Sequence, residues 1–353
     1  MISKATFWQW FYRRWQPNPA PPVPGYTLLL PVPGDLPVFL KIAMEVCSAQ
    51  HADRLVETVV VPDQWSPDFS DRLQQWTQTF SLDPVRLVRL RPIEQRIARY
   101  QNNPTTLHWL QLIRGAEAAR TSHLLLHDAD LFITEPGFMA QHYQACADQR
   151  LSCLGVSPVW DQWYARQGIH HLTATWELMM DVDWLRRFQP WQHRGHDGTI
   201  DGKPHTFDTT LWPQCQTKPD AIRRHQREWG FVHFNYVIST YRHFQKSQQR
   251  DRPFEDVNFR ILLIRLLINA YDPSDWPYAV PTLESLQRGL LQDGNPVTYR
   301  QAKTHRRYSE FRHKLSQFIT SGVLTPARQR ILREGIRPFD QALAAELQYS
   351  PAG

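Results

Sequence analysis

The chain has 353 residues, of which 42% are hydrophobic and 21% are charged, as in an ordinary soluble globular protein. No apolar run approaches the roughly 20 residues that span a bilayer, and no secretory signal is visible, so we expect no membrane span. The formal net charge of +6 favours an anionic partner, such as a phosphorylated small molecule, a nucleic acid or an acidic membrane surface. The four cysteines lack metal-ligand spacing and favour a reducing cytoplasm.

An aromatic and basic segment, residues 6–15, begins the chain. Helical spacing places its rings on one face: Phe7, Trp8, Phe11, Tyr12 and Trp15. Such a face could enter a membrane headgroup zone or pack on the protein's own surface, and the short length favours packing. The prolines of residues 17–25 predict a stiff linker. We therefore assign residues 1–24 to an N-terminal segment.

Strands and helices then alternate. Short continuous apolar runs predict strands at 26–32, 57–63, 85–90 and 123–127, and helical patterns fall at 36–50, 70–80 and 104–122. Alternation of this kind predicts an α/β fold whose mostly parallel sheet carries helices on both faces. In such sheets ligands bind beyond the carboxyl ends of the strands.

The second half of the chain is less regular. We expect a strand at 150–158, a strand or bend leading into a helix at 170–188, and a strand at 230–240. The polar stretch 193–207 predicts a mobile flap. From about residue 254 the pattern is helical and rich in arginine and lysine. We therefore predict a catalytic domain over 25–245 and a helical C-terminal region over 246–353.

The strand at 123–127 ends in two carboxylates, Asp128 and Asp130. Two neighbouring negative charges repel one another unless a cation lies between them and a further anion. Mg²⁺ and Mn²⁺ prefer oxygen ligands and bridge carboxylates to phosphates. A solvated acidic turn is the simpler interpretation, because Asp-x-Asp is a weak signal by itself. The preceding apolar strand and amphipathic helix favour the metal site.

The stretch "IRGAEAARTSHLLLHDAD" (113–130) resembles the nucleotide-diphospho-sugar glycosyltransferases of the GT-A fold. The resemblance extends over roughly residues 25–240 in element order and is sharp over 105–135. It implies a GT-A-like sheet, a nucleotide-diphospho-sugar donor, a glycan, lipid or small-molecule acceptor, and Mn²⁺ or Mg²⁺ as cofactor. It identifies no narrower family.

The resemblance also implies roles on the donor side. Asp130 would bind the metal directly, and Asp128 would bind it through water or meet the ribose hydroxyls. Asp63 would meet the nucleoside. The loop around Pro31, Val32 and Pro33 would wall the base. Arg114 is placed either to reach the donor or as a surface charge.

The later part of the chain offers the remaining candidates. His233 would supply a third metal ligand, with a hydrogen-bonded core histidine as the alternative. Asp208 would be the base of an inverting transferase, although it is followed by Thr-Thr, as a helix N-cap often is. Glu177 and Asp181 compete for the role of base. Tryptophans in this half could stack on sugar rings: Trp160, Trp163, Trp176 and Trp212.

Two other functions remain open. A haloacid-dehalogenase-like phosphatase also places Asp-x-Asp after an apolar strand, but there the motif continues x-Thr or x-Val, whereas Leu131-Phe132 follows here. A catalytically inactive GT-A-like scaffold would share the fold. No nucleic-acid reading motif is recognisable, so no nucleic-acid partner is expected. We predict a cytoplasmic, metal-dependent hexosyltransferase, with membrane contact through residues 6–15 as an alternative.

Overall fold

The computed structural model describes residues 4–13, 15, 20–50, 53–82, 84–101, 103–225, 229–249, 259–274, 276–291 and 301–348. Contacts divide the chain into two units, residues 1–231 and 232–353. The predicted boundary followed residue 245 instead, and the N-terminal helix belongs to the first unit. Within the described residues, no helix is long and apolar enough to cross a membrane.

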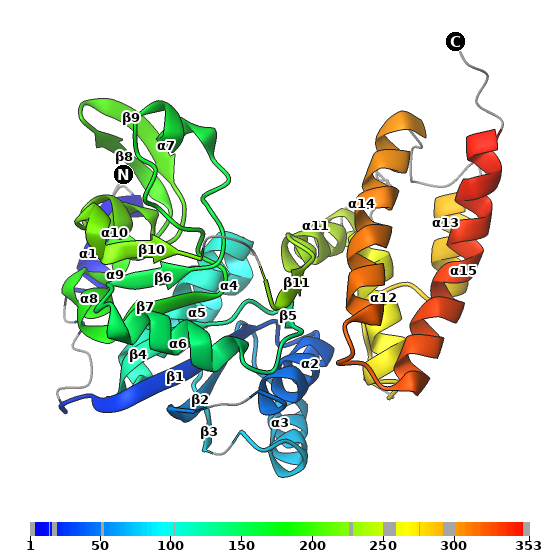
Figure 1. Ribbon diagram of the computed structural model, residues 1–353, viewed down its shortest axis with the longest axis horizontal. Coiled ribbons are helices and arrows are strands. Elements are labelled where there is room, and N and C mark those ends of the chain that lie inside the picture. Colours follow the sequence, from blue (N-terminus) through cyan, green and yellow to red (C-terminus); the bar gives the residue numbers. More distant parts are fainter. Residues whose placement is uncertain are drawn as a thin grey trace. The chain divides into compact units, whose positions relative to one another are not determined.

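A seven-stranded sheet forms the centre of the first unit (Figure 1). Its strands are β1 (Val23–Val32), β2 (Leu55–Pro62), β3 (Val85–Leu87), β4 (Thr121–Leu126), β6 (Cys153–Gly155), β7 (Leu178–Asp181) and β10 (Ile222–Arg224). They lie in the order β10-β6-β7-β4-β1-β2-β3. All neighbours are parallel except β7, which runs antiparallel to β4 and β6. The predicted α/β fold with a mostly parallel sheet is confirmed.

Helices and small sheets complete this unit. Its helices are α1 (Lys4–Phe11), α2 (Pro37–Ser48), α3 (Pro67–Thr79), α4 (Pro92–Gln101), α5 (Pro104–Ala118), α6 (Phe138–Asp148), α7 (Gln162–Arg166), α8 (Val182–Arg187), α9 (Pro190–His193), α10 (Leu211–Cys215) and the 3-10 helix η1 (Pro219–Ala221). Strand β5 (Leu131–Ile133) pairs with β11 (Phe231–His233), and β8 (His196–Ile200) pairs with β9 (Lys203–Phe207).

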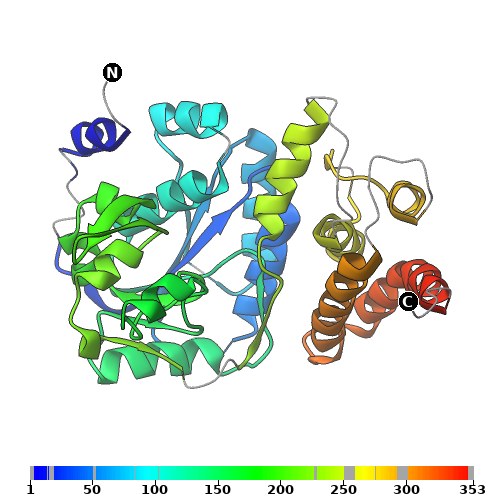
Figure 2. The same ribbon diagram turned by 90° about the horizontal axis from the view of Figure 1, so that it is seen from above.

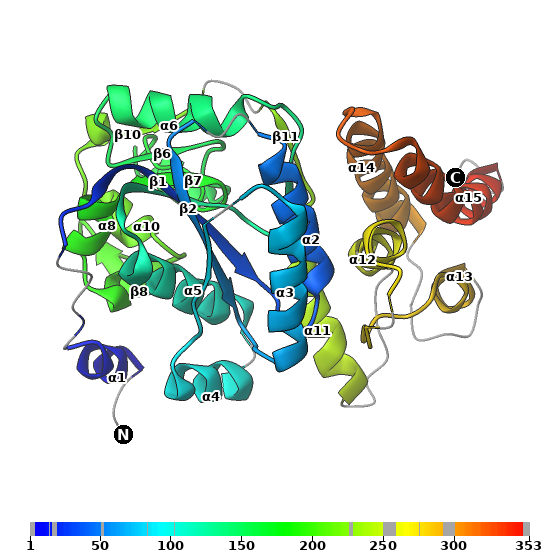
Figure 3. The ribbon, with the colours of Figure 1, turned by 90° about the horizontal axis from the view of Figure 1, so that it is seen from below.

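The sheet is covered on both faces (Figure 3). Leu29 belongs to the face covered by α5 and α8, and an added Cβ at Gly115 of α5 would come within 2.4 Å of the Leu29 side chain. The opposite face carries α6, where Tyr26 stacks on Tyr143. Burial on both faces explains why the strands read as unbroken apolar runs.

Residues 196–207 form an antiparallel hairpin, where the sequence predicted a polar flap. Its turn, Asp201-Gly202, has two positive φ angles, 49° and 75°. Two consecutive positive φ angles are typical of the type I′ turn, whose twist matches that of the flanking strands. The alternating polar residues therefore belong to a two-stranded ribbon.

The second unit is helical, as predicted. It contains α11 (Val237–Gln249), α12 (Phe259–Tyr271), α13 (Leu283–Leu291), α14 (Gln301–Thr320) and α15 (Pro326–Gln348). Helix α12 is apolar on nearly every side because α11, α13, α14 and α15 all contact it. Figure 2 shows these helices grouped around it. Tyr308 and Arg312 of α14 both bond to Asp340 of α15.

Helix α1 packs into the core of the first unit, as the alternative to a membrane anchor predicted. Trp8 is 1% exposed and meets Trp109 of α5 edge to face at 4.8 Å. Tyr12 is equally buried and donates a 2.8 Å hydrogen bond to Glu94. The aromatic face that would have entered a membrane is therefore turned inward.

We expect Trp8→Ala to lower the free energy of unfolding by about 3 kcal/mol, because it opens a cavity beside Trp109. Trp10 is the matched control: it is 56% exposed on the same helix, so Trp10→Ala should change stability by less than about 0.5 kcal/mol. Urea unfolding followed by fluorescence measures both. Equal effects of the two substitutions would contradict the packing of α1.

Candidate functional site

Several polar groups meet at the carboxyl edge of the parallel strands. Asp63, which follows β2, accepts a 2.9 Å hydrogen bond from the N–H of Gly34, which follows β1. Gly34 lies so close to the backbone that follows β2 that an added Cβ would fall 1.7 Å from the carbonyl oxygen of Gln64. Gln111 of α5 donates to the carbonyl oxygens of Val32 and Val61 at 3.0 and 2.6 Å. These bonds fix the ends of β1 and β2 against α5.

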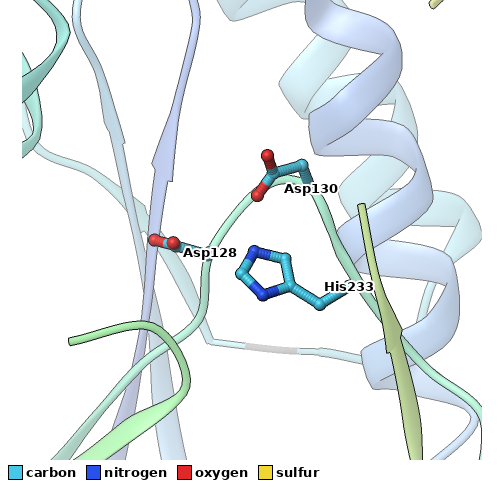
Figure 4. Close-up of side chains that lie close together, drawn as sticks. All are labelled: Asp128, Asp130 and His233. Atoms are coloured by element: carbon cyan, nitrogen blue, oxygen red, sulfur yellow. The ribbon is translucent and has the colours of Figure 1, made fainter. Parts of the chain in front are cut away.

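Asp128, Asp130 and His233 lie close together beside this edge (Figure 4). Each offers one ligand atom, and these atoms lie within 4.8 Å of one another. The two aspartates belong to the loop between β4 and β5, and His233 ends β11, the strand paired with β5. In Figure 4 the imidazole points toward the loop that carries both carboxylates. Asp130 is 6% exposed, whereas Asp128 and His233 are half-buried.

The donor set fits a divalent cation. Two carboxylates supply the oxygen ligands that Mg²⁺ and Mn²⁺ prefer, and an imidazole nitrogen favours Mn²⁺ over Mg²⁺. A bound cation would also relieve the repulsion between the aspartates. The three residues that the sequence offered as metal ligands are thus brought together by the pairing of β11 with β5.

His108 is a fourth group at this cluster, and it is not among the candidates drawn from the sequence. Its Nε2 lies 3.0 Å from Oδ1 of Asp128. Burial alone would lower the pKa of His108, but Asp128, with Asp208 and Asp130, raises it above its ordinary value. A signal existed: a helix that precedes a parallel strand runs antiparallel to it, so the first turns of α5 lie beside the end of β4.

Asp208 lies within electrostatic reach of the cluster. It follows β9, and its Oδ1 accepts a 2.7 Å hydrogen bond from the N–H of Thr209. Its charge contributes to the raised pKa of His108. The N-cap of α10 is Thr210, so the carboxylate of Asp208 does not serve as that cap.

Glu177, the competing candidate base, is fully buried. Its Oε2 lies 2.6 Å from Nδ1 of His127, and both side chains are 0% exposed. Burial alone would lower the pKa of His127, but Glu177 raises it. The carboxylate thus faces His127 and is closed to solvent.

Arg114 lies on α5, on the helix that the sequence predicts, among acidic side chains. Arg114 pairs with Glu117, and its Nε lies 3.8 Å from the buried Glu94. It is six residues beyond His108 on α5, about 9 Å along the helix axis, so its charge is neutralised well away from Asp128.

Pro31 lies inside β1, opposite Val61, and not in the loop after it. The ladder between β1 and β4 ends at Leu29 and Leu126. Pro31 lies two residues beyond the end of that ladder, so its lack of a backbone N–H removes no hydrogen bond from the ladder. The loop itself begins at Pro33.

Comparisons with known proteins find distant likenesses among solved structures. No protein family and no curated protein matches the chain. Mannosyltransferase PcManGT from Pyrobaculum calidifontis, in complex with GDP-Man and Mn²⁺, is 13% identical with a TM-score of 0.41, covering 98% of this chain and 86% of that one. S. aureus TarS 1–349 is 8% identical with a TM-score of 0.39, covering 92% of each chain. Galactosyltransferase LgtC is 11% identical with a TM-score of 0.37, covering 47% of this chain and 62% of that one. At these values the likenesses do not assign a function.

Proposed function

We propose that this protein is a metal-dependent glycosyltransferase that takes its sugar from a nucleotide-diphospho-sugar. The observation that carries the proposal is the cluster of Asp128, Asp130 and His233 at the carboxyl edge of a parallel sheet. Such an edge is where open α/β sheets bind ligands. A diphosphate needs a cation, and this donor set suits one. The formal net charge of +6 agrees with an anionic donor.

Different residues of the chain would bind the donor, hold the cation and accept the proton. Asp63 and Gly34, held together by their hydrogen bond, would wall the nucleoside side. A divalent cation held by Asp128, Asp130 and His233 would offset the charge that develops on the departing diphosphate. Asp208 would accept the proton of the acceptor hydroxyl, which implies inversion at the anomeric carbon.

Among the four candidate tryptophans, Trp160 is best suited to stack on an acceptor sugar. It is 58% exposed. Trp163 already stacks on His205 at 3.9 Å, and Trp212 packs edge-on against Phe207 at 5.1 Å. A ring already covered by another ring has less free surface to offer a sugar. We therefore assign Trp160 to the acceptor side.

A thermal-shift screen of UDP-sugars and GDP-sugars, each with and without Mn²⁺, tests the function. At a ligand concentration 100 times the dissociation constant, binding adds about 2.7 kcal/mol to the free energy of unfolding, which raises Tm by a few degrees. We expect a nucleotide-sugar to raise Tm only when Mn²⁺ is present, and this rise to be lost with EDTA.

The other two functions predict different results. A phosphatase would release phosphate from small phosphoesters and would leave sugar nucleotides intact. An inactive scaffold would show the Tm shift without transfer of sugar. No shift with any sugar nucleotide would contradict the proposal.

A further inference from the structure

A chain of hydrogen bonds through buried side chains leads to His127, the residue that follows β4. Nε2 of His225 lies 2.8 Å from Nδ1 of His142, and Nε2 of His142 lies 3.2 Å from the carbonyl oxygen of Glu177. The Glu177 side chain continues the chain, with Oε2 2.6 Å from Nδ1 of His127. His142, Glu177 and His127 are each at most 1% exposed. The next residue after His127 is Asp128.

One arrangement of protons satisfies every bond in the chain. A carbonyl oxygen only accepts, so His142 carries its proton on Nε2. Burial, with the neighbouring His225, lowers the pKa of His142 to about 3, so the ring is neutral and its Nδ1 accepts from His225. At the other end, His127 donates its Nδ1–H to the carboxylate of Glu177. Each bonded ring nitrogen therefore has one role, either donor or acceptor.

Glu177 has an unfavourable backbone conformation at its place in this hydrogen-bond chain. Its φ is +48°, in the left-handed region that costs a non-glycine residue about 1 kcal/mol. Such a conformation persists where the surroundings fix it. Here they do so twice, because the carbonyl oxygen is bound by His142 and the carboxylate by His127.

The hydrogen-bond chain ends at His127, where the pairing of β4 with β1 also ends. The last pair of that ladder is Leu29 with Leu126, and one more bond follows it, from the N–H of His127 to the carbonyl oxygen of Leu29 at 3.0 Å. Asp128 and Asp130 follow at once in the loop before β5. The side chain of His127, fixed by Glu177, is therefore the last buried anchor before the two carboxylates.

We propose that Glu177, with His142 behind it, is a positioning residue for the cation site: it fixes His127 and thereby the main chain from which Asp128 and Asp130 project. This inference rests on the proposed metal-dependent function. It also gives Glu177 a role other than the catalytic base. The length of the side chain is what matters, because the carboxylate must span the distance from the backbone just before β7 to His127.

Two substitutions separate length from charge. Glu177→Gln keeps the length and an oxygen that accepts from His127 Nδ1–H, but removes the charge. Glu177→Asp keeps the charge and tolerates a positive φ, but is one methylene shorter. We expect Glu177→Asp to weaken Mn²⁺ binding by about tenfold, as losses behind metal ligands do, and Glu177→Gln to stay within about threefold of wild type.

Mn²⁺ alone is the probe, with free Mn²⁺ measured by electron paramagnetic resonance, and thermal unfolding reports folding of each variant. His123→Asn is the matched control: His123 lies in β4, four residues before His127, is 9% exposed, and contacts Ser122 and Tyr143 outside the chain of bonds. It should leave Mn²⁺ affinity unchanged even where it lowers Tm.

Other outcomes overturn the proposal in distinct ways. Loss of affinity in Glu177→Gln but not in Glu177→Asp would show that charge acts, not position. Wild-type affinity in both would remove the role of Glu177 altogether. If Asp130→Ala also binds Mn²⁺ like wild type, then the proposed function fails and not merely this inference.

Discussion

Replacing Asp130 by alanine is expected to lower turnover by at least about 100-fold and to abolish the Mn²⁺-dependent rise in Tm. Asp130 is the more buried of the two aspartates, 6% exposed, and its carboxylate belongs to the cluster within 4.8 Å. A cation that offsets leaving-group charge contributes several kcal/mol to transition-state stabilisation, and each 1.36 kcal/mol is a factor of ten in rate. Steady-state transfer assays and thermal shifts with Mn²⁺ measure the two effects.

The fold should survive the substitution. Removing one of two neighbouring negative charges relieves repulsion in the metal-free protein, so we expect its Tm to change by only a few degrees. Asp148→Ala is the control: this exposed carboxylate on α6 accepts from Gln144 and should affect neither turnover nor the Mn²⁺ response. Full turnover of the Asp130→Ala protein would remove the metal from the mechanism.

The framework of this site was predictable from local pattern. Unbroken apolar runs mark strands that are buried on both faces, and β4 is such a strand, since Leu124, Leu125 and Leu126 are 0% exposed. The position of Asp128 just beyond it follows from the length of the run. Placing His233 near Asp128 required the resemblance, because the pairing of β11 with β5 joins segments about 100 residues apart and leaves no local signal.

The roles of Arg114 and Glu177 depend on their surroundings, which local sequence does not reveal. Arg114 meets Glu94 and Glu117, and Glu177 meets His127. These pairs depend on which helix or strand packs against each residue. His108 was missed for the same reason, since only the antiparallel course of α5 beside β4 brings it to Asp128.

His108 bears on which residues would hold a cation most tightly. Its imidazole lies 3.0 Å from Asp128; burial alone would lower the pKa of that imidazole, but Asp128, with Asp208 and Asp130, raises it. The same imidazole would compete with a metal for Asp128. Asp130 and His233 are therefore the ligands that we expect to contribute most to affinity.

Replacing Asp208 by asparagine is expected to lower kcat by about 10²–10⁴-fold, the range that a positioned proton acceptor contributes. Asparagine keeps the side-chain oxygen that accepts from the N–H of Thr209, so the loop after β9 should hold its shape while the proton acceptor is lost. Because Asp208 is not among the cation ligands, the Mn²⁺-dependent Tm shift with a sugar nucleotide should persist. This split, a fall in kcat with donor binding retained, distinguishes Asp208 from Asp130.

Asp197→Asn supplies the matched control on the same hairpin. Asp197 is exposed and accepts from Thr206 Oγ1 at 2.7 Å, so its loss should change kcat less than about twofold. The product of the wild-type reaction tests the assignment independently, because a base at Asp208 requires inversion of the anomeric configuration. A retained configuration, or an Asp208→Asn protein with wild-type kcat, would exclude Asp208 as the base. Another group would then have to deprotonate the acceptor hydroxyl, and Glu177 could not do so because it is closed to solvent behind His127.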